Sequence, residues 1–395
     1  MRPQKSSGIL ITVQGSNLVK SAAAFLLFIF MIFSISGAIT SLNPDLRPSS
    51  ESVNKAASFF SADLLYKIIG TENRAFAANM DLEEGPNLSS LLFQLSTNIN
   101  LDDPRSLLGR ELPSFTIFDT EILVAGEGTN YTNMPIESAP PQDVFEGKSE
   151  PPLQNVDDLD EGEPGEDTAP PPQSTDGKEV VYVYFTHNTE SFLPYLKGVT
   201  DPNKAFHSQI NVTKIGDKLK EELEGKGIGT TIDKTDVQSR LVKKGWSYGQ
   251  SYQESREVIA SALGSNKDLT YLIDIHRDSR RKEQTTKVIN GESYAQLAFV
   301  IGGKHQNYEK NNQLAQQLHK GLESKYPGLS RGVLLKDKSG SNGIYNQDLS
   351  ENAILVEFGG VDNTFEELNR SAAALADVFS EFYWQAEEVN GSAQN

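Results

Sequence analysis

The chain has 395 residues, a formal net charge of −18 and no cysteine, and this length suffices for about two or three domains. The missing cysteine excludes thiol nucleophiles, disulfides and cysteine zinc sites. The acidic balance argues against a nucleic-acid partner, because phosphate binding needs a positively charged surface.

Residues 21–42 are the first predicted element, because they contain the uncharged run SAAAFLLFIFMIFSISGAIT. A helix that rises about 1.5 Å per residue over this length crosses a hydrocarbon core about 30 Å thick. Basic residues (Arg2, Lys5, Lys20) precede it, so the positive-inside rule predicts a cytoplasmic tail at 1–20 and an extracytoplasmic remainder. The prediction is a single-pass protein of the cell membrane. A cleaved signal peptide is the alternative, since small residues near the end of the run resemble a cleavage site.

Two further segments precede the last domain. Residues 43–134 contain two stretches with apolar side chains at helical spacing, and they predict a small membrane-proximal helical region. Residues 135–178 are rich in Pro, Asp, Glu and Gly, and cannot bury enough apolar surface to offset the entropy lost on ordering. They predict a disordered acidic linker.

Residues 179–395 alternate between apolar runs and amphipathic stretches. The apolar runs predict strands at 179–186, 228–233, 269–276, 294–302 and 353–359, and the amphipathic stretches predict helices at 211–227, 251–266, 311–328 and 364–388. Apolar strands separated by helices indicate an α/β domain with a mainly parallel sheet and helices on both faces.

Polar side chains follow three of these strands where the strands end. His187 comes directly after the first strand, His276 ends the third, and Glu357 lies near the end of the last. Ligands bind beyond the carboxyl ends of parallel strands, so we expect these side chains to converge on one site. Each histidine has a structural alternative, a hydrogen-bonded strand end or a pairing with a nearby aspartate. A carboxylate in an apolar strand, as at Glu357, is costly unless it is paired or protonated.

Histidine nitrogens with a carboxylate oxygen favour zinc, and catalytic zinc sites use three protein ligands. His187 and His276 are the first two predicted ligands. The third is either Glu190, three residues after His187, or His207, four residues before Asn211 at the predicted helix start. The structural alternatives are a loop cap for Glu190 and an exposed loop histidine for His207.

The predicted chemistry is metal-assisted amide hydrolysis. Zinc acidifies a water molecule, and Glu357 is placed to accept its proton and return it to the leaving amine. Arg277 and Arg280 follow His276, and we expect them at the mouth of the site, where arginine can bind the carboxylates of an acidic peptide stem; a solvated basic turn is the alternative. We assign no role to the two remaining histidines, His305 and His319, which lie in polar sequence predicted to form helical surface.

Five stretches carry a family resemblance, in this order: THNTESFLP, HSQINVTKIGD, YLIDIHRDSRR, SNGIYNQDLS and LVEFGGVDNTFEEL. They resemble the stage II sporulation protein P family, within the zinc-dependent N-acetylmuramoyl-L-alanine amidases, across residues 179–384. The resemblance implies a membrane-anchored peptidoglycan hydrolase that cleaves the muramic acid–L-alanine amide, with cleavage of peptide cross-links as a further option. It also implies action at the septal membrane during septal thinning and engulfment, with the sporulation proteins D and M as partners.

In the amidase group, histidine, glutamate and histidine hold the metal, and a later glutamate is catalytic. His187, His276 and Glu357 match the first, third and last of these. The ligand glutamate of the group usually stands four residues before an asparagine that opens a helix, and His207 occupies that position here. Either histidine replaces glutamate, or Glu190 takes its place. Two other functions stay open at this point: a zinc endopeptidase or carboxypeptidase that acts on stem peptides, and a non-catalytic cell-wall-binding scaffold.

Overall fold

The computed structural model describes residues 120–156, 159, 171–306, 308–337 and 341–392. The predicted tail, the predicted membrane anchor and most of the predicted helical region therefore lie outside the described residues. Among the helices that are described, none combines the length and the apolar composition needed to span a bilayer.

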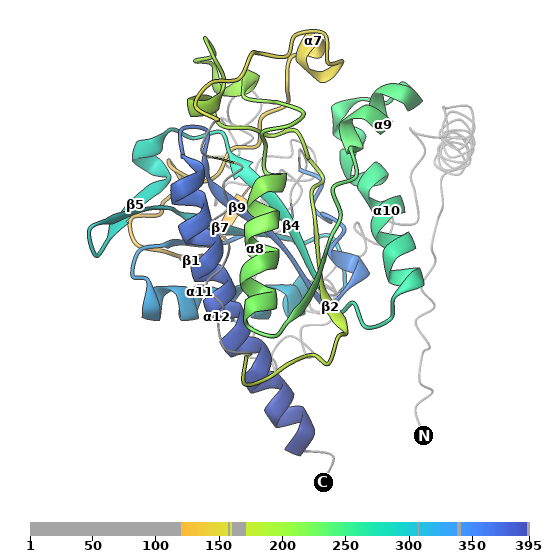
Figure 1. Cartoon of the computed structure of the whole chain (residues 1–395), viewed down its shortest axis with the longest axis vertical. Helices are drawn as coiled ribbons and strands as arrows, with labels where there is room; N and C mark the ends of the chain where they lie inside the picture. The colour runs from red at the N-terminus through yellow and green to blue at the C-terminus, as the bar shows by residue number, and fades with distance from the viewer. Residues whose placement is uncertain (1–119, 157–158, 160–170, 307, 338–340, 393–395) are drawn as a thin grey trace, which may run out of the picture. The chain divides into compact units, whose positions relative to one another are not determined.

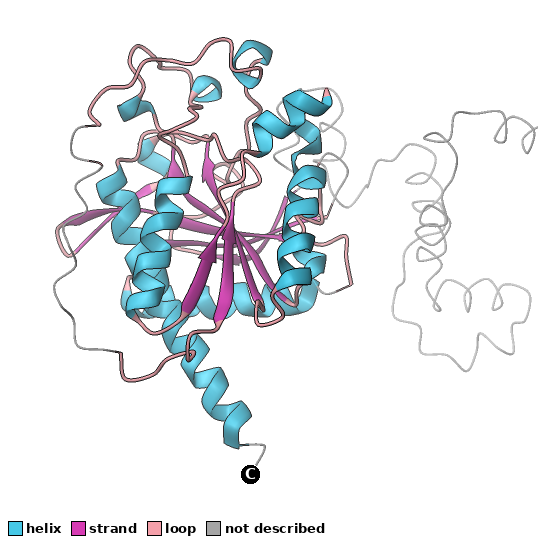
Figure 2. Ribbon diagram, turned by 45° about the vertical axis from the view of Figure 1, so that its right-hand side comes forward, coloured by secondary structure: helices cyan, strands magenta, loops and turns pink. Residues whose placement is uncertain are grey.

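A seven-stranded sheet forms the centre of the fold, in the order β1-β8-β7-β9-β4-β2-β3 (Figures 1 and 2). Its strands are β1 (Thr120–Ala125), β2 (Glu179–Tyr184), β3 (Gly229–Ile232), β4 (Tyr271–Asp278), β7 (Leu297–Gly302), β8 (Ser330–Lys336) and β9 (Asn352–Gly360). Strands β2, β3, β4 and β9 are parallel to one another, whereas β7 pairs antiparallel with β9 and parallel with β8, and β1 pairs antiparallel with β8. The predicted α/β class is confirmed, and the sheet is mixed and mostly parallel.

Helices cover both faces of this sheet (Figure 2). They are α8 (Thr213–Gly225), α9 (Val237–Lys244), α10 (Ser251–Ser265), α11 (Tyr308–Lys325) and α12 (Phe365–Ser392). Because side chains alternate along a strand, one face presents Val183, Ile273 and Val356 to the large core shared with α8, α11 and α12. The other face presents Leu272 to Ile259 of α10. The face under α10 also carries the polar residues of the candidate site.

Each strand and helix predicted in residues 179–395 is present, and one predicted strand is divided into two. The predicted strand 294–302 is shared between β6 (Glu292–Ala295), which forms a hairpin with β5 (Thr286–Ile289), and β7. Three elements were not predicted: β8, β5 and α9. β5 and α9 are short and polar, and the continuous apolar run of β8 covers only residues 333–335.

Residues 120–156 differ from the expectation of a helical region followed by a disordered linker. They form strand β1 and the short helix α7 (Gln142–Phe145), and they bury Met134, Val144 and Phe145. We call residues 133–139 the strap. A few apolar anchors in a polar, proline-rich segment are enough to hold it, because its backbone groups find partners in the domain. The most acidic part of the predicted linker, 160–170, lies outside the described residues.

A buried ion pair anchors the strap. Arg331 Nη1 donates to Asp278 Oδ2 over 2.6 Å, and neither side chain is more than 2% exposed. Asp278 Oδ1 accepts from the backbone N–H of Ile136 over 2.9 Å, while Arg331 also donates to the carbonyl of Asn133. Arg280 adds a bond from Nε to the carbonyl of Met134, 3.0 Å long. Strands β4 and β8 thus fix the strap across the sheet.

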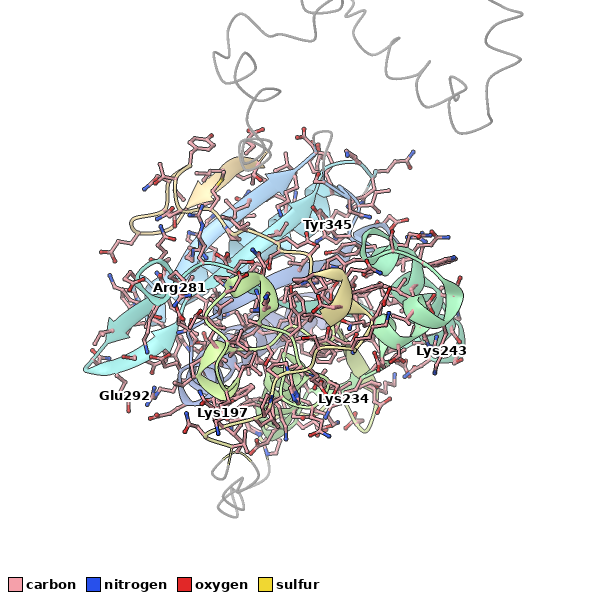
Figure 3. All side chains as sticks on the ribbon, turned by 90° about the horizontal axis from the view of Figure 1, so that it is seen from above. Lys197, Lys234, Lys243, Arg281, Glu292 and Tyr345 are labelled. Atoms are coloured by element: carbon pink, nitrogen blue, oxygen red, sulfur yellow. The ribbon has the colours of Figure 1, made fainter. Side chains whose placement is uncertain are left out.

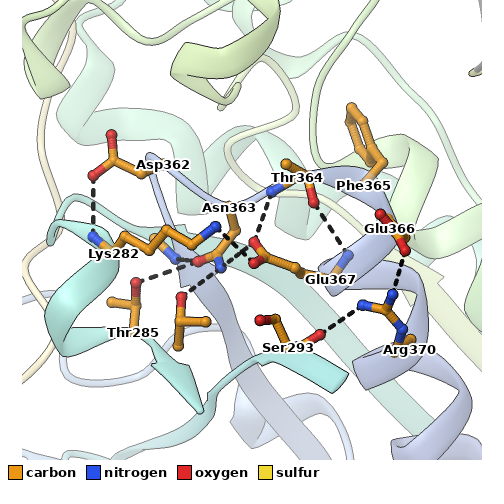
Figure 4. Close-up of polar contacts among 12 residues, drawn as sticks. Lys282, Thr285, Ser293, Asp362, Asn363, Thr364, Phe365, Glu366, Glu367 and Arg370 are labelled. Carbon is orange, nitrogen blue, oxygen red and sulfur yellow. Dashed lines mark hydrogen bonds and ion pairs between the residues drawn. The ribbon is translucent and has the colours of Figure 1, made fainter. Parts of the chain in front are cut away.

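A polar network fixes the turn between β9 and α12 (Figure 4). Glu367 Oε2 accepts from the backbone N–H of Thr364, and the Thr364 hydroxyl accepts from the backbone N–H of Glu367, which is a capping box. Asn363 joins the backbone N–H of Gly360 to the Glu367 carboxylate, and Lys282 pairs with Glu367 over 2.7 Å. The end of β9 is therefore tied to the loop that follows β4.

We expect Arg331→Met to destabilise the protein by about 3–5 kcal/mol, because it leaves the Asp278 carboxylate buried without its cation. Urea unfolding of the full-length chain measures this loss. Lys310→Met is the control, since Lys310 forms an exposed pair with Glu351 and its loss should cost less than about 1 kcal/mol. Equal losses in the two variants would contradict a structural role for the buried pair.

Candidate metal centre

Three buried side chains converge where β2 and β4 end. One ligand atom each from His187, Glu190 and His276 lies within 4.8 Å of the other two. The two Nδ1 atoms face the carboxylate between them: His187 Nδ1 is 3.8 Å from Glu190 Oε1, and His276 Nδ1 is 3.6 Å from Glu190 Oε2. All three side chains are at least 95% buried. This group can hold a metal ion.

The loop that follows β2 positions His187 and Glu190. Asp274 of β4 accepts from the backbone N–H of Thr186 over 3.0 Å and from its hydroxyl over 2.7 Å. The backbone N–H of Glu190 then donates to the carbonyl of His187 over 3.1 Å, which closes a tight turn. An isolated antiparallel bridge between Glu190 and Phe206 holds the far side of that turn. The spacing of three residues therefore brings both side chains to the same point.

His276 lies on β4, and each of its ring nitrogens faces a carboxylate. Nδ1 faces Glu190, and Nε2 lies 3.1 Å from Asp274 Oδ2. Histidines that bind metals usually contact a carboxylate through their other nitrogen, which orients the ring. Burial disfavours a charge on His276, but the carboxylates of Asp274 and Glu190 raise its pKa well above the ordinary value.

Glu190 is held in its ionised form. Burial alone would raise its pKa, but His187, His276 and Arg277 together lower the pKa well below its usual range. Its Oε2 also accepts from the backbone N–H of Arg277 over 3.1 Å. A buried carboxylate that stays charged is a strong candidate for binding a cation.

Arg277 does not have the exposed position that was expected of a substrate contact, and Arg280 is half-buried. Arg277 is 1% exposed, and its guanidinium donates to the carbonyls of Ser191 and Ala205, each over 2.9 Å. Alternation along β4 explains this, since Arg277 faces away from the side to which its neighbour His276 points. Arg280 donates to the strap. Both arginines hold loops around the site.

His207 does not join the group, and Glu190 takes the third position. His207 Nδ1 accepts from the backbone N–H groups of Gln209, over 3.1 Å, and Ile210, over 3.3 Å, in the turn that leads into α8. The loop-cap alternative that was considered for Glu190 therefore applies to His207.

The two histidines without an assigned role also differ from the expected helical surface. His319 is in α11 but buried, with Nδ1 2.8 Å from the Ser330 hydroxyl. His305 lies in the loop after β7 and is half-buried. Neither belongs to the metal group.

Glu357 lies on β9 directly beside His276, because the two residues are register partners in the parallel β4–β9 pair. On its other side, the register partner on β7 is the small residue Ala298. Burial raises the pKa of Glu357 to about 8; the charge of His276 opposes this, whereas Glu190 and Asp278 add to it. This carboxyl group can therefore both release and take up a proton near neutral pH.

Unpaired atoms support a cation at this place. Among the described residues, His187 Nδ1, Glu190 Oε1, His276 Nε2 and Glu357 Oε2 are buried without a hydrogen-bond partner, and such atoms are rare in folded proteins. Three of the four belong to the group itself. Two imidazoles and one carboxylate are also a known ligand set of catalytic zinc, which leaves a fourth position open.

Glu137 is a site residue that the sequence analysis did not find. It lies on the strap, and its Oε1 is 3.3 Å from His187 Nδ1. The segment was assigned to a linker from its acidic composition. The signals against this assignment were the apolar residues Met134, just before it, and Ile136, Val144 and Phe145 within it, of which Met134 is completely buried.

A cavity of about 500 Å³ opens beside the metal group. Its lining includes His187, Glu137, Tyr248, Tyr252, Tyr345 and Lys336. The Tyr248 ring stacks on the His187 ring, with the centroids 4.4 Å apart. Of the metal group, His187 lines this cavity.

A family model and a curated relative both match this chain and point to the same family. The family model of stage II sporulation protein P matches residues 102–380. The chain is 51% identical over 391 residues to stage II sporulation protein P of Bacillus subtilis strain 168, and the match covers 99% of this chain and 98% of that protein. The resemblance noted from the five sequence stretches is confirmed.

We expect Glu190→Gln to lower bound zinc at least about tenfold, because it removes a charged ligand, while His207→Asn keeps the zinc of the parent protein. Elemental analysis of the full-length chain after dialysis against dilute zinc measures both. The opposite pattern, with zinc lost only in His207→Asn, would contradict the assignment of the third ligand.

We expect Glu357→Gln to stabilise the metal-free protein more at pH 8 than at pH 4.5. The pKa of Glu357 rises from 4.5 to about 8 on folding, so its contribution to stability is present below pH 4.5 and is lost as the pH rises through 8. Glutamine does not ionise and avoids this loss. Thermal unfolding at the two pH values measures the difference, and a gain of the same size at both would contradict the shift.

Proposed function

Because the chain belongs to the stage II sporulation protein P family, we propose that it is a peptidoglycan hydrolase that cleaves the amide bond between muramic acid and L-alanine. One observation carries the proposal: the buried group of His187, Glu190 and His276 lies next to a second buried carboxyl group, Glu357. A protein that only binds cell wall has no need of that carboxyl group beside a metal site. The arrangement therefore favours an enzyme over a scaffold.

His187, Glu190 and His276 would hold zinc. A zinc ion there would supply a Lewis acid that polarises the scissile carbonyl and acidifies a water molecule. In its ionised form, Glu357 would accept a proton from that water, and its pKa of about 8 suits the return of the proton to the leaving amine. Asp274 keeps the His276 ring in place, and the Tyr248 ring covers His187, so that both ligands are oriented before the substrate arrives.

The proposed setting of this activity is the septal membrane during septal thinning and engulfment. Two features support it: the family, and the apolar run at residues 21–42 with basic residues before it. The catalytic domain would then face the extracytoplasmic space, which holds the peptidoglycan. We propose the sporulation proteins D and M as partners from the family resemblance alone.

Full-length protein incubated with purified peptidoglycan tests the activity. We expect free stem peptides and peptide-free glycan, detected by mass spectrometry, and we expect a chelator to abolish both. Glu357→Gln should slow the release by a factor of about 10²–10⁴, because it removes the proton acceptor, while the zinc content stays that of the parent. Glu351→Gln is the matched control, since Glu351 is an exposed glutamate on the loop before β9.

Release that persists in the presence of the chelator, or at the full rate in Glu357→Gln, would overturn the mechanism. Products that contain only split cross-links would replace the amidase assignment by an endopeptidase assignment. A chain that begins at residue 179 is unsuitable for this assay, because it lacks β1 and the strap that contacts His187.

A further inference from the structure

The cavity beside His187 reaches from the metal group to the far end of β8. Its lining includes His187 of the metal group, and also Lys336 at the end of β8 with its β1 pairing partner Thr120. Strand β8 runs antiparallel to β4 and β9, so its last residue lies away from the strand ends that carry the metal group. The cavity thus has a metal-binding end and a lysine end.

Tyrosines form one side of the cavity. Tyr252 and Tyr345 pack edge to face, with their centroids 5.0 Å apart, and both rest on Val300 and Leu355 of the sheet. Figure 3 shows Tyr345 between the strands of the sheet and the helices α9 and α10. The strap adds Pro135, Ile136, Glu137 and Ala139 to the same lining.

Among the described residues, Lys336 is a half-buried cation with no carboxylate within 4.0 Å of its ammonium. Its Nζ lies 6.0 Å from the centroid of the Tyr345 ring. Burial lowers its pKa, but Tyr345, Glu137, Glu357 and Asp278 outweigh burial and raise the pKa. A charged, half-buried ammonium is stabilised when an anion joins it.

Two hydroxyl groups in the same lining also lack partners. Among the described residues, the hydroxyls of Tyr248 and Tyr252 are buried without a hydrogen bond, and Tyr252 as a whole is only 7% exposed. Buried hydroxyls without partners are costly. Each can donate to an oxygen of a bound molecule.

We propose that Lys336 binds a carboxylate of the substrate's peptide stem, while the amide to be cleaved lies at the metal group. The proposal rests on the proposed function and specifies its substrate as an acidic peptide with a free carboxylate. It gives Lys336 the task for which the sequence analysis considered Arg277 and Arg280, whose guanidiniums bind backbone carbonyls instead. The lactyl carboxyl group of muramic acid is part of the amide to be cleaved, so the carboxylate that we assign to Lys336 is one of the attached peptide.

Binding to a soluble muramoyl peptide tests this inference apart from catalysis. The full-length Glu357→Gln protein, loaded with zinc, is titrated calorimetrically with the free-acid peptide and with the same peptide after amidation of its carboxylates. We expect about 10- to 100-fold tighter binding of the free acid, the effect of one charge-assisted hydrogen bond. Adding Lys336→Met should remove this preference, and adding Lys336→Arg should restore most of it.

Lys310→Met is the matched control, because this lysine is exposed and remote from the cavity, and it should keep the preference. If Lys336→Met lowers the melting temperature, Lys336→Gln replaces it. Equal binding of acid and amide by the parent overturns the inference even when wild-type protein cleaves peptidoglycan, and so does an unchanged preference in Lys336→Met. A preference that depends on Lys336 supports it even when no peptidoglycan is cleaved, and that result would count against the amidase proposal alone.

Discussion

The buried carboxylate of Glu190 is the constraint on which the site depends. A charge at 1% exposure needs partners on every side, and the surrounding chain supplies them. The backbone of Arg277 donates to it, and the rings of His187 and His276 face it. The Arg277 side chain in turn holds the carbonyls of the two loops that enclose the turn. A cation between the two rings completes an environment that is already arranged around negative charge.

Strand β4 positions the other parts of the site around Glu190. Three acceptors or ligands lie on one of its faces at alternate positions, Asp274, His276 and Asp278. Asp274 fixes the loop that carries His187, His276 faces the metal position, and Asp278 holds the strap together with Arg331. A single buried strand therefore sets the relative positions of three chain segments that are far apart in sequence.

Much of the fold and part of the site follow from sequence patterns, for reasons that particular residues make clear. His187, His276 and Glu357 stand at the ends of apolar runs, and the parallel pairing of β2, β4 and β9 brings such ends together. Composition could not reveal the strap, because its polar sequence is typical of a disordered segment. A few hydrogen bonds to its backbone and one buried methionine are enough to hold it on the domain. Arg277 was expected in an exposed basic turn after the strand. In fact β4 continues through Arg277 to Asp278, and because side chains alternate along a strand, Arg277 points to the other face from His276.

The pairing of β1 with β8 determines how the domain responds to mechanical load. Strand β1 is the first described element of the domain, and among the described strands it lies at the edge of the sheet and pairs with β8 alone. Tension applied through the preceding chain therefore acts first on the β1–β8 hydrogen bonds and next on the strap that lies against His187. Had the domain begun at residue 179, the same tension would have entered through β2, which is paired on both sides. Pulling on this protein thus reaches the wall of its cavity before it reaches the core.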